Sequence, residues 1–582
     1  MINMVQNAKD QAAALAMAAY QAAVADGTLP QAEVKTAPVE IPKDTANGDF
    51  TTTFALAASK ALRQPPRNIA QALLDHMDLA GSYFASAEIA GPGFLNFRLN
   101  DSWYAAVCEA VESEGAGYGT ADHLKGQKIM VEFVSANPTG PMHMGNARGG
   151  VLGDTLASVL AACGADVTRE FYVNDAGHQI DKFAHSIEAR YLQIIRGEDA
   201  VPFPEDGYQG EDIKDLARAY YEKNGDKLLD VPEAERQEAL AQFGLSINLP
   251  KMKTDLERYK IHYDNWFYES SLHESGYVKE TVDLLAERGW TYEKDGALWL
   301  RTADILRDHY RRQGKKEADI EKLDLKDDVL RRANGFYTYF AADIAYHRNK
   351  FAVRGFDKVI NIWGADHHGH VARLQAALDG LGLDGSHRLV IVLMQLVNLL
   401  QDGKPVRMSK RTGKAIALHD LLDEISVDAA RYYFNNRVST SPLDFDLDLA
   451  VRQDSDNPVY YVQYAHARIC SLVARMGEAG VAVCPAGQAD ASLLAEPEEQ
   501  ALVKALAQYP EEVHQAARTY DPSRINRYLT GLAGDFHRFY NACRCMVDDP
   551  CLQAARLKLA DTTRQVLANG LGLLGVSAPE KM

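Results

Sequence analysis

The chain contains 582 residues, 47% of them hydrophobic and 24% charged, and its formal net charge at pH 7 is −18. This length predicts about three or four domains, because a single hydrophobic core does not grow to such a size. The acidic charge argues against a general nucleic-acid binder, although a local basic patch can still bind one specific RNA.

Two further features of the composition concern the compartment. Seven cysteines without regular spacing fit a reducing environment better than a disulfide framework, so we expect a cytoplasmic protein. The longest apolar stretch, residues 389–400, contains Gln395 and Asn398 and is too short to span a membrane. We therefore expect no membrane contact.

Residues 1–118 are expected to form an N-terminal α+β domain. Residues 12–25 are rich in alanine and imitate a signal peptide, but Lys9 and Asp10 precede them and their period is that of an amphipathic helix. Several glycines between residues 115 and 126 then indicate a linker.

Residues 119–425 are expected to form a Rossmann-like α/β domain with a parallel sheet, because strands alternate with helices along the sequence. The predicted elements are a strand at 129–134, a helix at 149–163, a strand at 166–173, a helix from 175, a strand at 358–363, a helix ending at 381 and a strand at 389–400. Charged helical sequence around residues 190–330 predicts an insertion. Asp402 and Gly403 are typical of a hairpin tip.

Residues 426–582 show helical periodicity with little strand signal, which predicts an all-α helical bundle. Its first part interleaves aromatic and basic side chains, the combination that stacks unpaired bases and contacts phosphates. These residues are Tyr460, Tyr461, Tyr464, His466 and Arg468. Helical spacing places Tyr461, Tyr464 and Arg468 on one face. The alternative for any single tyrosine is a place in the core of the bundle.

Two distant motifs point to nucleotide chemistry. Residues 141–146, PMHMGN, follow a strand and open a helix, whose N-terminal amides attract phosphate. His143 can donate to phosphate oxygens as charge develops, and Gly145 lets the backbone approach a ligand. Residues 407–411, RMSKR, offer Lys410 as a cation for transferring phosphates, with Ser409 as its hydrogen-bond partner. A chance match and a solvated basic loop are the alternatives, and the pairing of the motifs favours a nucleotide-activation site.

The turn at residues 364–370, GADHHGH, follows a predicted strand and should lie at the carboxyl ends of the sheet. There Asp366 can accept hydrogen bonds from ribose hydroxyls, while Gly364 lets adenine approach. The alternative is a metal site, since Asp366, His367, His368 and His370 are all ligand types. No distant Cys/His cluster clearly completes a metal set.

Tyr339 and Asp343 are four residues apart and share a face if they lie on a helix. A carboxylate beside an aromatic ring suits a guanidinium, which can pair with the carboxylate and stack on the ring. The alternative is a core tyrosine and a solvated aspartate.

The strand before His143, the His143 motif, the Gly364 turn and the Lys410 loop together resemble the class I aminoacyl-tRNA synthetases. Four further stretches resemble the arginyl-tRNA synthetases specifically: residues 131–149, 91–94 (GPGF), 429–432 (AARY) and 578–582 (APEKM). The likeness covers nearly the whole chain.

This resemblance implies that ATP activates L-arginine to arginyl-adenylate and that the arginyl group then passes to the 3′ end of tRNA(Arg). His143, Asn146 and Lys410 would be catalytic. The implied arginine site contains Glu132, Ser135, Ala136, Asn137, Asn146, Tyr339, Asp343 and His367. The implied ATP site contains His143, Gly145, Gly364, Asp366, His370, Met408, Ser409 and Lys410. Magnesium would travel with the phosphates, so no protein-caged metal is expected.

The resemblance also implies how tRNA is held. The N-terminal domain would contact the elbow of the tRNA and the C-terminal domain would read the anticodon, with Tyr460, Tyr461, Tyr464 and Arg468 as candidate contacts. A monomer is the usual state of the family.

Three positions depart from the usual pattern of the family. Asn146 stands where the first motif usually ends in histidine, Arg407 where the loop usually opens with lysine, and His367 where some arginine enzymes use glutamine to hold the substrate. Other readings are a nucleotidylyltransferase that activates a small acid without RNA, a catalytically inactive tRNA-binding scaffold, and a zinc hydrolase at residues 367–370.

Overall fold

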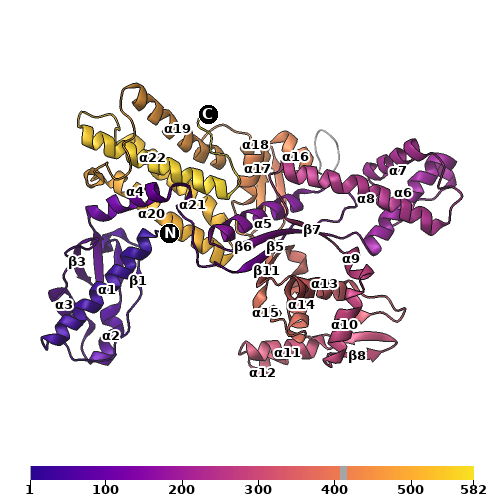
Figure 1. Cartoon of the computed structure of the whole chain (residues 1–582), viewed down its shortest axis with the longest axis horizontal. Coiled ribbons are helices and arrows are strands. Elements are labelled where there is room, and N and C mark those ends of the chain that lie inside the picture. Colours follow the sequence, from indigo (N-terminus) through magenta and orange to yellow (C-terminus); the bar gives the residue numbers. More distant parts are fainter. Residues whose placement is uncertain (1, 407–415) are drawn as a thin grey trace.

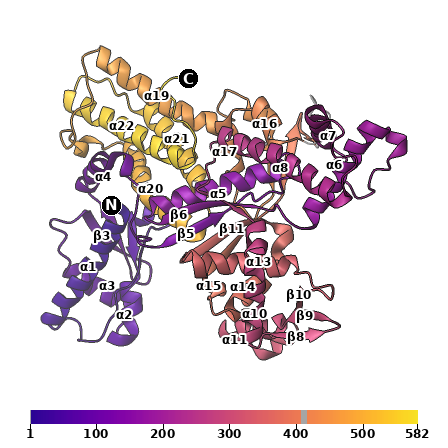
Figure 2. The same cartoon turned by 45° about the vertical axis from the view of Figure 1, so that its right-hand side comes forward.

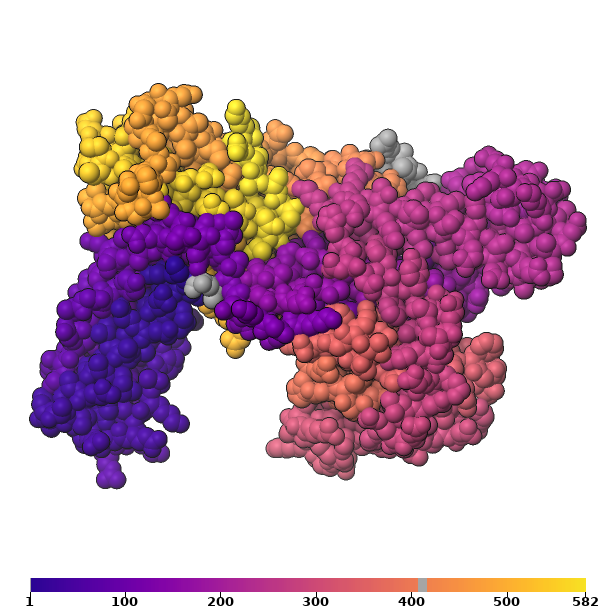
Figure 3. All heavy atoms as spheres, viewed as in Figure 1, coloured from indigo at the N-terminus to yellow at the C-terminus, as the bar shows by residue number. Residues whose placement is uncertain are grey.

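A computed structural model describes residues 2–406 and 416–582. The N-terminal domain and the C-terminal helices lie at one end of the molecule, and the central parallel sheet joins them to two inserted lobes at the other (Figure 1). Between the N-terminal domain and the lower inserted lobe, which contains residues 270–331, the surface is deeply hollowed (Figure 3). The expected α/β fold with an N-terminal α+β part and a helical C-terminal part is confirmed.

The N-terminal domain packs helices on an antiparallel sheet of order β1-β2-β4-β3. Its elements are α1 (Met4–Ala25), β1 (Val39–Glu40), β2 (Phe50–Thr52), α2 (Phe54–Leu62), α3 (Pro66–Asp75), β3 (Phe84–Ala90) and β4 (Phe94–Leu99). The alanine-rich stretch is a helix, as predicted. Ala8, Ala12, Ala16 and Ala19 are all buried along one face of α1, where the small side chain lets other elements approach closely.

The central sheet is parallel throughout and has the order β12-β11-β5-β6-β7. Its strands are β5 (Lys128–Glu132), β6 (Asp166–Val173), β7 (Asn265–Tyr268), β11 (Lys358–Gly364) and β12 (Leu389–Met394). Helix α5 (Met144–Ala162) covers one face, and α13 (Tyr339–Arg348) and α14 (His368–Gly380) lie on the other (Figures 1 and 2). The chain order reverses between β5 and β11. In sheets of this kind, ligands bind at such a switch point, outside the carboxyl ends of the strands.

The insertion differs from the single helical segment predicted around residues 190–330. Strand β7 lies within that range and belongs to the central sheet, so the inserted sequence divides into two lobes. The first lobe is helical, has its own apolar core and projects from the molecule (Figure 2). It contains α6 (His178–Arg196), α7 (Glu211–Asn224) and α8 (Glu233–Arg258).

The second lobe combines helices with an antiparallel sheet of order β10-β9-β8. Its elements are α9 (Ser270–Glu274), α10 (Tyr277–Glu287), β8 (Thr291–Lys294), β9 (Ala297–Leu300), α11 (Thr302–Arg312), α12 (Glu317–Ile320) and β10 (Asp328–Arg331). The sequence prediction missed these strands because charged residues obscure their alternation.

The apolar run at residues 389–400 forms two strands in two different sheets, since the chain turns at Gln395 and Leu396 after β12. Strand β13 (Val397–Gln401) pairs with β14 (Lys404–Val406) across the predicted hairpin tip, and with β15 (Leu443–Asp446) on its other side. Asp402 and Gly403 both have positive φ, 53° and 69°, as tight hairpin turns require.

The C-terminal part consists of helices packed against α4 (Asp101–Glu114) and α5. The helices are α16 (Leu418–Glu424), α17 (Val427–Phe434), α18 (Leu447–Ala450), α19 (Pro458–Glu478), α20 (Pro497–Thr519), α21 (Ser523–Ala542) and α22 (Pro550–Leu573). Helix α15 (Gly385–Arg388) precedes β12 in the central domain. Buried apolar residues form one continuous core through the N-terminal, central and C-terminal parts.

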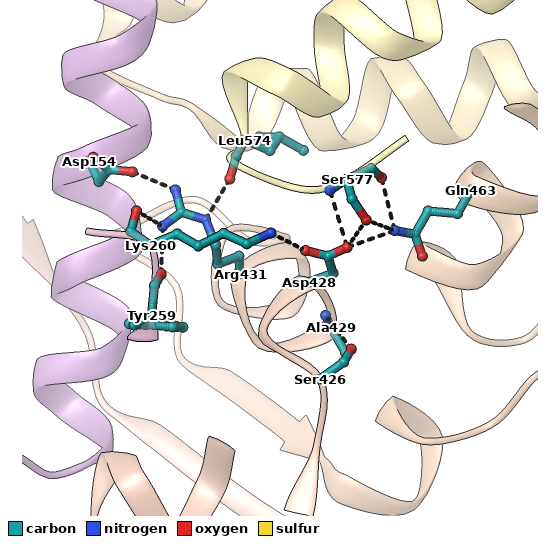
Figure 4. A network of polar contacts seen from close by, with 10 residues as sticks. All are labelled: Asp154, Tyr259, Lys260, Ser426, Asp428, Ala429, Arg431, Gln463, Leu574 and Ser577. Atoms are coloured by element: carbon teal, nitrogen blue, oxygen red, sulfur yellow. Dashed lines mark hydrogen bonds and ion pairs between the residues drawn. The ribbon is translucent and has the colours of Figure 1, made fainter. Parts of the chain in front are cut away.

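A polar network around the buried Arg431 connects the last residues of the chain to the central domain (Figure 4). Arg431 on α17 donates to the backbone carbonyls of Tyr259, Lys260 and Leu574 and forms an ion pair with Asp154 on α5. One side chain thereby joins segments that lie far apart in the sequence.

Candidate active site

A cavity of about 940 Å³ lies at the carboxyl ends of the first two strands of the central domain, β5 and β6. Seven of the predicted site residues line it: Ser135, Ala136, Asn137, His143, Asn146, Tyr339 and His367. They come from the turn after β5, the start of α5, the start of α13 and the turn after β11. Segments that are as much as 232 positions apart therefore meet in one chamber.

The turn after β5 is strained. Val134 and Ser135 have φ values of 68° and 43°, a region that costs a non-glycine residue about 1–3 kcal/mol and is rare for a β-branched one. Hydrogen bonds hold it: the Ser135 hydroxyl donates to Glu132 Oε1 at 2.9 Å, and the Tyr172 amide donates to Ser135 Oγ at 3.1 Å. The Tyr263 hydroxyl donates to the Phe133 carbonyl at 3.0 Å.

His143 is the N-cap residue of α5, where the helix start faces the cavity. The Asn146 side-chain oxygen accepts from the His143 amide at 3.0 Å and so fixes the first turn. Burial lowers the pKa of His143 below its ordinary value, which favours the neutral imidazole. A neutral ring can donate one hydrogen bond to an anion beside the helix start.

Helix α13 presents the tyrosine and aspartate that the sequence pairs. Tyr339 is 48% exposed, and its hydroxyl accepts from the backbone amide of His178 at 3.0 Å. Asp343 lies one turn further along, outside the cavity lining, with Oδ2 3.0 Å from His370 Nε2. His370 in turn packs against the rings of Phe340 and Trp363.

The turn after β11 places Asp366 at the surface with its side chain 82% exposed, while His367 lines the cavity. A side chain at Gly364 would meet the Asp366 carboxylate, which is exposed and could move aside. Within residues 2–406 and 416–582, no group of three or more His, Cys, Asp or Glu side chains is arranged to hold a metal ion.

Comparisons with known proteins identify the family. The chain is 50% identical to the arginine–tRNA ligase of Acetivibrio thermocellus and 49% identical to that of Caldanaerobacter subterraneus, with 100% of each chain covered in both cases. The chain belongs to the arginyl-tRNA synthetase family. The family model for tRNA synthetases class I (R), catalytic domain, matches residues 109–444.

Two other family models match the ends of this arginyl-tRNA synthetase chain. The arginyl tRNA synthetase N terminal domain matches residues 11–99, and the DALR anticodon binding domain matches residues 462–582. The fold is that of the Thermus thermophilus arginyl-tRNA synthetase structure, with a TM-score of 0.72, 24% identity, and coverage of 98% of this chain and 99% of that one.

Glu132, predicted as a second carboxylate for the guanidinium, lies beneath the cavity rather than in its lining. Its carboxylate is buried, with Oε2 2.5 Å from Lys350 Nζ and Oε1 bonded to Ser135. Lys350 lies 218 residues away in the sequence, so no local pattern indicates this partner.

Met408, Ser409 and Lys410, together with Arg407, lie outside the described residues. The chain beyond them returns to the site: Ala417 forms a β-bridge with His143, and the Leu418 amide donates to the Met142 carbonyl at 2.8 Å. Ala417 and Leu418, which follow these residues in the chain, therefore lie beside the His143 motif.

The cavity also has a wall that the sequence did not reveal. Its residues follow β6 or belong to the helical lobe: Asn174, His178, Gln179, Tyr208, Gln209, Gly210 and Asp212. Asn174 comes directly after a strand of the sheet, a position that the carboxyl-end rule could have singled out. Residues 208–210 lie in the loop that leads into α7, and Asp212 lies in the first turn of that helix. No sequence signal marks them.

The aromatic face of α19 lies far from the cavity in sequence. The rings of Tyr460 and Tyr464 are stacked with centroids 5.9 Å apart, and the Arg468 guanidinium lies 5.9 Å from the Tyr464 ring. Tyr461 packs against His537 of α21 at 4.9 Å. His466 is on the other side, buried, with Nδ1 2.8 Å from the Pro579 carbonyl, so it is not part of this face.

No helix in the described part of the chain combines the length and the apolar character needed to cross a membrane.

Proposed function

We propose that the cavity beside His143 is where this chain, an arginine–tRNA ligase, activates arginine with ATP. The observation that carries the proposal is the single chamber shared by the His143 helix start, the turn at Ser135 and the ring of Tyr339. A nucleotide-activating group and an amino-acid pocket must share a chamber, because the arginine carboxylate attacks the α-phosphate.

Arginine would lie between Tyr339 and the turn at Ser135, which both line this chamber. Tyr339 and Asp343 would receive its guanidinium, with His370 yielding its contact to Asp343 as the substrate binds. Ser135, Ala136, Asn137 and Asn146 would receive its backbone end, and His367 would border the substrate from the turn after β11. Glu132 would act from beneath, through Ser135, since both of its oxygens are already engaged.

ATP would lie along the start of α5. The neutral His143 ring and the backbone at Gly145 would contact its phosphates, and Gly364 and Asp366 would hold its adenosine, with His370 close to that turn. Met408, Ser409 and Lys410 would meet the phosphates as well; the proposal is supported by Ala417, which follows them in the chain and forms a β-bridge with His143. Magnesium would be bound with the phosphates and in no protein cage.

Asp343 gives the sharpest test of this assignment. Replacing Asp343 by asparagine removes a charge-assisted partner of the guanidinium, a loss of about 2–3 kcal/mol. We expect the KM for arginine to rise about 30- to 150-fold in arginine-dependent pyrophosphate–ATP exchange, run with saturating tRNA(Arg). Asp366→Asn is the matched control: it should raise the KM for ATP and leave that for arginine within about twofold.

An unchanged KM for arginine in Asp343→Asn would mean that another carboxylate binds the guanidinium. A rise in both constants in both variants would indicate a general disturbance of the site, and would leave neither residue with the role given to it.

The α19 face would bind the tRNA(Arg) chain away from its acceptor end, and the N-terminal domain would contact the elbow. Tyr460, Tyr461 and Tyr464 offer ring faces for unpaired bases, and Arg468 adds a cation beside them. The enzyme would work as a cytoplasmic monomer, with the hollow between its N-terminal domain and lower lobe open to the RNA (Figure 3).

A change at Tyr464 can separate stacking on RNA from a general effect on folding, because this residue is 38% exposed. Tyr464→Ala should weaken tRNA(Arg) binding about 5- to 150-fold, as expected for the loss of one base–aromatic stack of about 1–3 kcal/mol. Tyr464→Phe keeps the ring and should bind within about threefold of the parent. Binding is measured by fluorescence anisotropy at fixed salt, and equal affinities for the two variants would remove Tyr464 from the interface.

A further inference from the structure

The helix that carries Tyr339 and Asp343 ends in an unusual way. Directly after α13, residues Asn349–Val353 form a turn of π-helix, closed by the Arg354 amide on the Asn349 carbonyl at 3.0 Å. Such wide turns are rare and occur frequently at functional sites. Here the turn directs Lys350 into the protein, where it is 0% exposed, while Val353 remains 63% exposed.

Lys350 is therefore a buried cation beneath the cavity. Its ammonium group bonds to Glu132 Oε2 at 2.5 Å and to Asn361 Oδ1 at 3.4 Å, and lies 4.0 Å from the Tyr346 ring. Burial lowers the pKa of Lys350, and the carboxylates of Glu132 and Glu170 oppose that shift. A buried ion pair adds little net stability compared with apolar residues of the same volume, so stability alone does not account for it.

The pair reaches the cavity through the second oxygen of Glu132. Oε1 accepts from the Ser135 hydroxyl at 2.9 Å, and Ser135 Oγ accepts from the Tyr172 amide at 3.1 Å. Ser135 belongs to the strained turn and lines the cavity. A strained backbone keeps its conformation only where its surroundings over-determine it, and Glu132 can do so only if it is itself held in place.

We propose that Lys350 is a positioning residue for arginine: it fixes Glu132 and, through Glu132, the Val134–Ser135 turn that receives the backbone end of the substrate. The inference rests on the proposed arginine site. In this proposal, α13 and its π-turn contribute to both ends of the arginine site. Tyr339 and Asp343 bind the guanidinium of the substrate, and Lys350 supports the turn that binds its backbone end.

Arg354 provides a matched control from the same turn. Its guanidinium pairs with Glu170, which also accepts from the Tyr346 hydroxyl at 2.5 Å and from Asn265 at 2.6 Å. These partners of Glu170 do not line the cavity. Both cations neutralise a buried carboxylate under the same sheet, yet only the Lys350 pair has a contact that continues to Ser135.

The experiment compares Lys350→Met with Arg354→Met in the full-length enzyme. Both should lower the melting temperature. In arginine-dependent pyrophosphate–ATP exchange with tRNA(Arg), Lys350→Met should raise the KM for arginine more than tenfold with the KM for ATP within about twofold. Arg354→Met should keep both constants within about twofold of the parent. Equal KM values for arginine in the two variants would overturn the proposal.

A double variant covers the case in which Lys350→Met does not fold. Lys350→Met with Glu132→Gln removes both buried charges and should recover most of the melting temperature, because no unpaired carboxylate is left. Its KM for arginine should stay raised, since the amide at position 132 has no anchor. A return of the KM to the parent value together with the melting temperature would show a structural role only.

Ser135→Ala tests whether Lys350 acts through Ser135, as in a double-mutant cycle. Added to the double variant, it should raise the KM for arginine by less than its effect in the parent, because both changes act on one turn. Effects that multiply would mean that Lys350 and Ser135 act independently and would overturn the inference. Asp343→Asn distinguishes the two proposals: if it shifts the KM for arginine and Lys350→Met does not, only the role of Lys350 fails.

Discussion

Lys350 beneath the cavity and Arg431 between the domains are both fully buried, and each meets a carboxylate oxygen at 2.5 Å. They differ in how many segments they join. Lys350 fixes one carboxylate, whereas Arg431 also donates to the carbonyls of Tyr259, Lys260 and Leu574 (Figure 4). A planar guanidinium with five donors can serve several acceptors at fixed angles, and a point-like ammonium cannot.

This difference suggests different roles for the two residues: Lys350 positions a side chain of the arginine site, whereas Arg431 holds segments of the fold together. The carboxylate partner of Arg431, Asp154, also accepts from Arg169 Nε at 3.0 Å, so it does not depend on one cation. Asp154 and Arg431 do not line the cavity. We therefore expect changes at Arg431 to alter stability with little effect on arginine binding, and changes at Lys350 to alter both.

Arg431→Met should have the largest effect on stability. It removes four contacts at once and leaves three backbone carbonyls without their donor, which should lower the free energy of unfolding by about 3–5 kcal/mol. The KM for arginine should remain within about twofold. Urea denaturation followed by steady-state exchange measures both quantities. A KM shift as large as that of Lys350→Met would erase the distinction between the two networks.

Gly575→Ala tests the contacts around Arg431 by adding a methyl group beside its guanidinium. A Cβ there would lie 2.5 Å from Arg431 Nη2, and φ at Gly575 is +66°, which side chains rarely adopt. We expect a loss of about 2 kcal/mol, seen as a lower urea midpoint. Gly572→Ala is the control, because it lies within α22 with nothing within 4 Å of its Cβ, and it should gain up to about 1 kcal/mol. Equal losses would contradict the steric argument.

The parts of the site that the sequence predicted are those with a local pattern. Residues 141–146 combine extended backbone, an N-cap and a helix start within a few positions, and the structure has this arrangement. Tyr339 and Asp343 could be paired because helical spacing alone relates them. The Lys350–Glu132 pair could not be found this way, since its members lie 218 residues apart and a π-turn, which has no sequence signature, turns Lys350 inward.

The remaining surprises have a similar origin. Strand β7 is only four residues long and lies between two charged lobes, so its signal is lost in theirs. Tyr208 and Asp212 line the cavity from the helical lobe, a tertiary contact that periodicity does not encode. The positive φ of Val134 opposes the preference of a β-branched residue, and local propensity therefore argues against the observed turn.

Asp428→Asn gives the smallest expected change and tests the electrostatic part of the interdomain network. The Asp428 carboxylate accepts from Lys260 at 2.8 Å, from the Ser577 amide at 3.1 Å and from Gln463 at 3.0 Å. Burial raises the pKa of Asp428, but the hydrogen bonds from Lys260 and Ser577 outweigh it and hold the pKa below its ordinary value. Because Lys260 is 47% exposed and screened by solvent, the charge should contribute only about 1 kcal/mol.

The sign of the pH dependence follows from that lowered pKa. A carboxyl group whose pKa is lower in the folded state stabilises the fold above its unfolded pKa, near 4, and loses this contribution as the pH falls through the folded value. The parent should therefore exceed Asp428→Asn in urea midpoint at pH 7, and the gap should narrow as the pH falls below about 4. A difference in urea midpoint that is unchanged at pH 3 would mean that the asparagine disturbs packing rather than charge. The charge of Asp428 would then contribute nothing to the network in Figure 4.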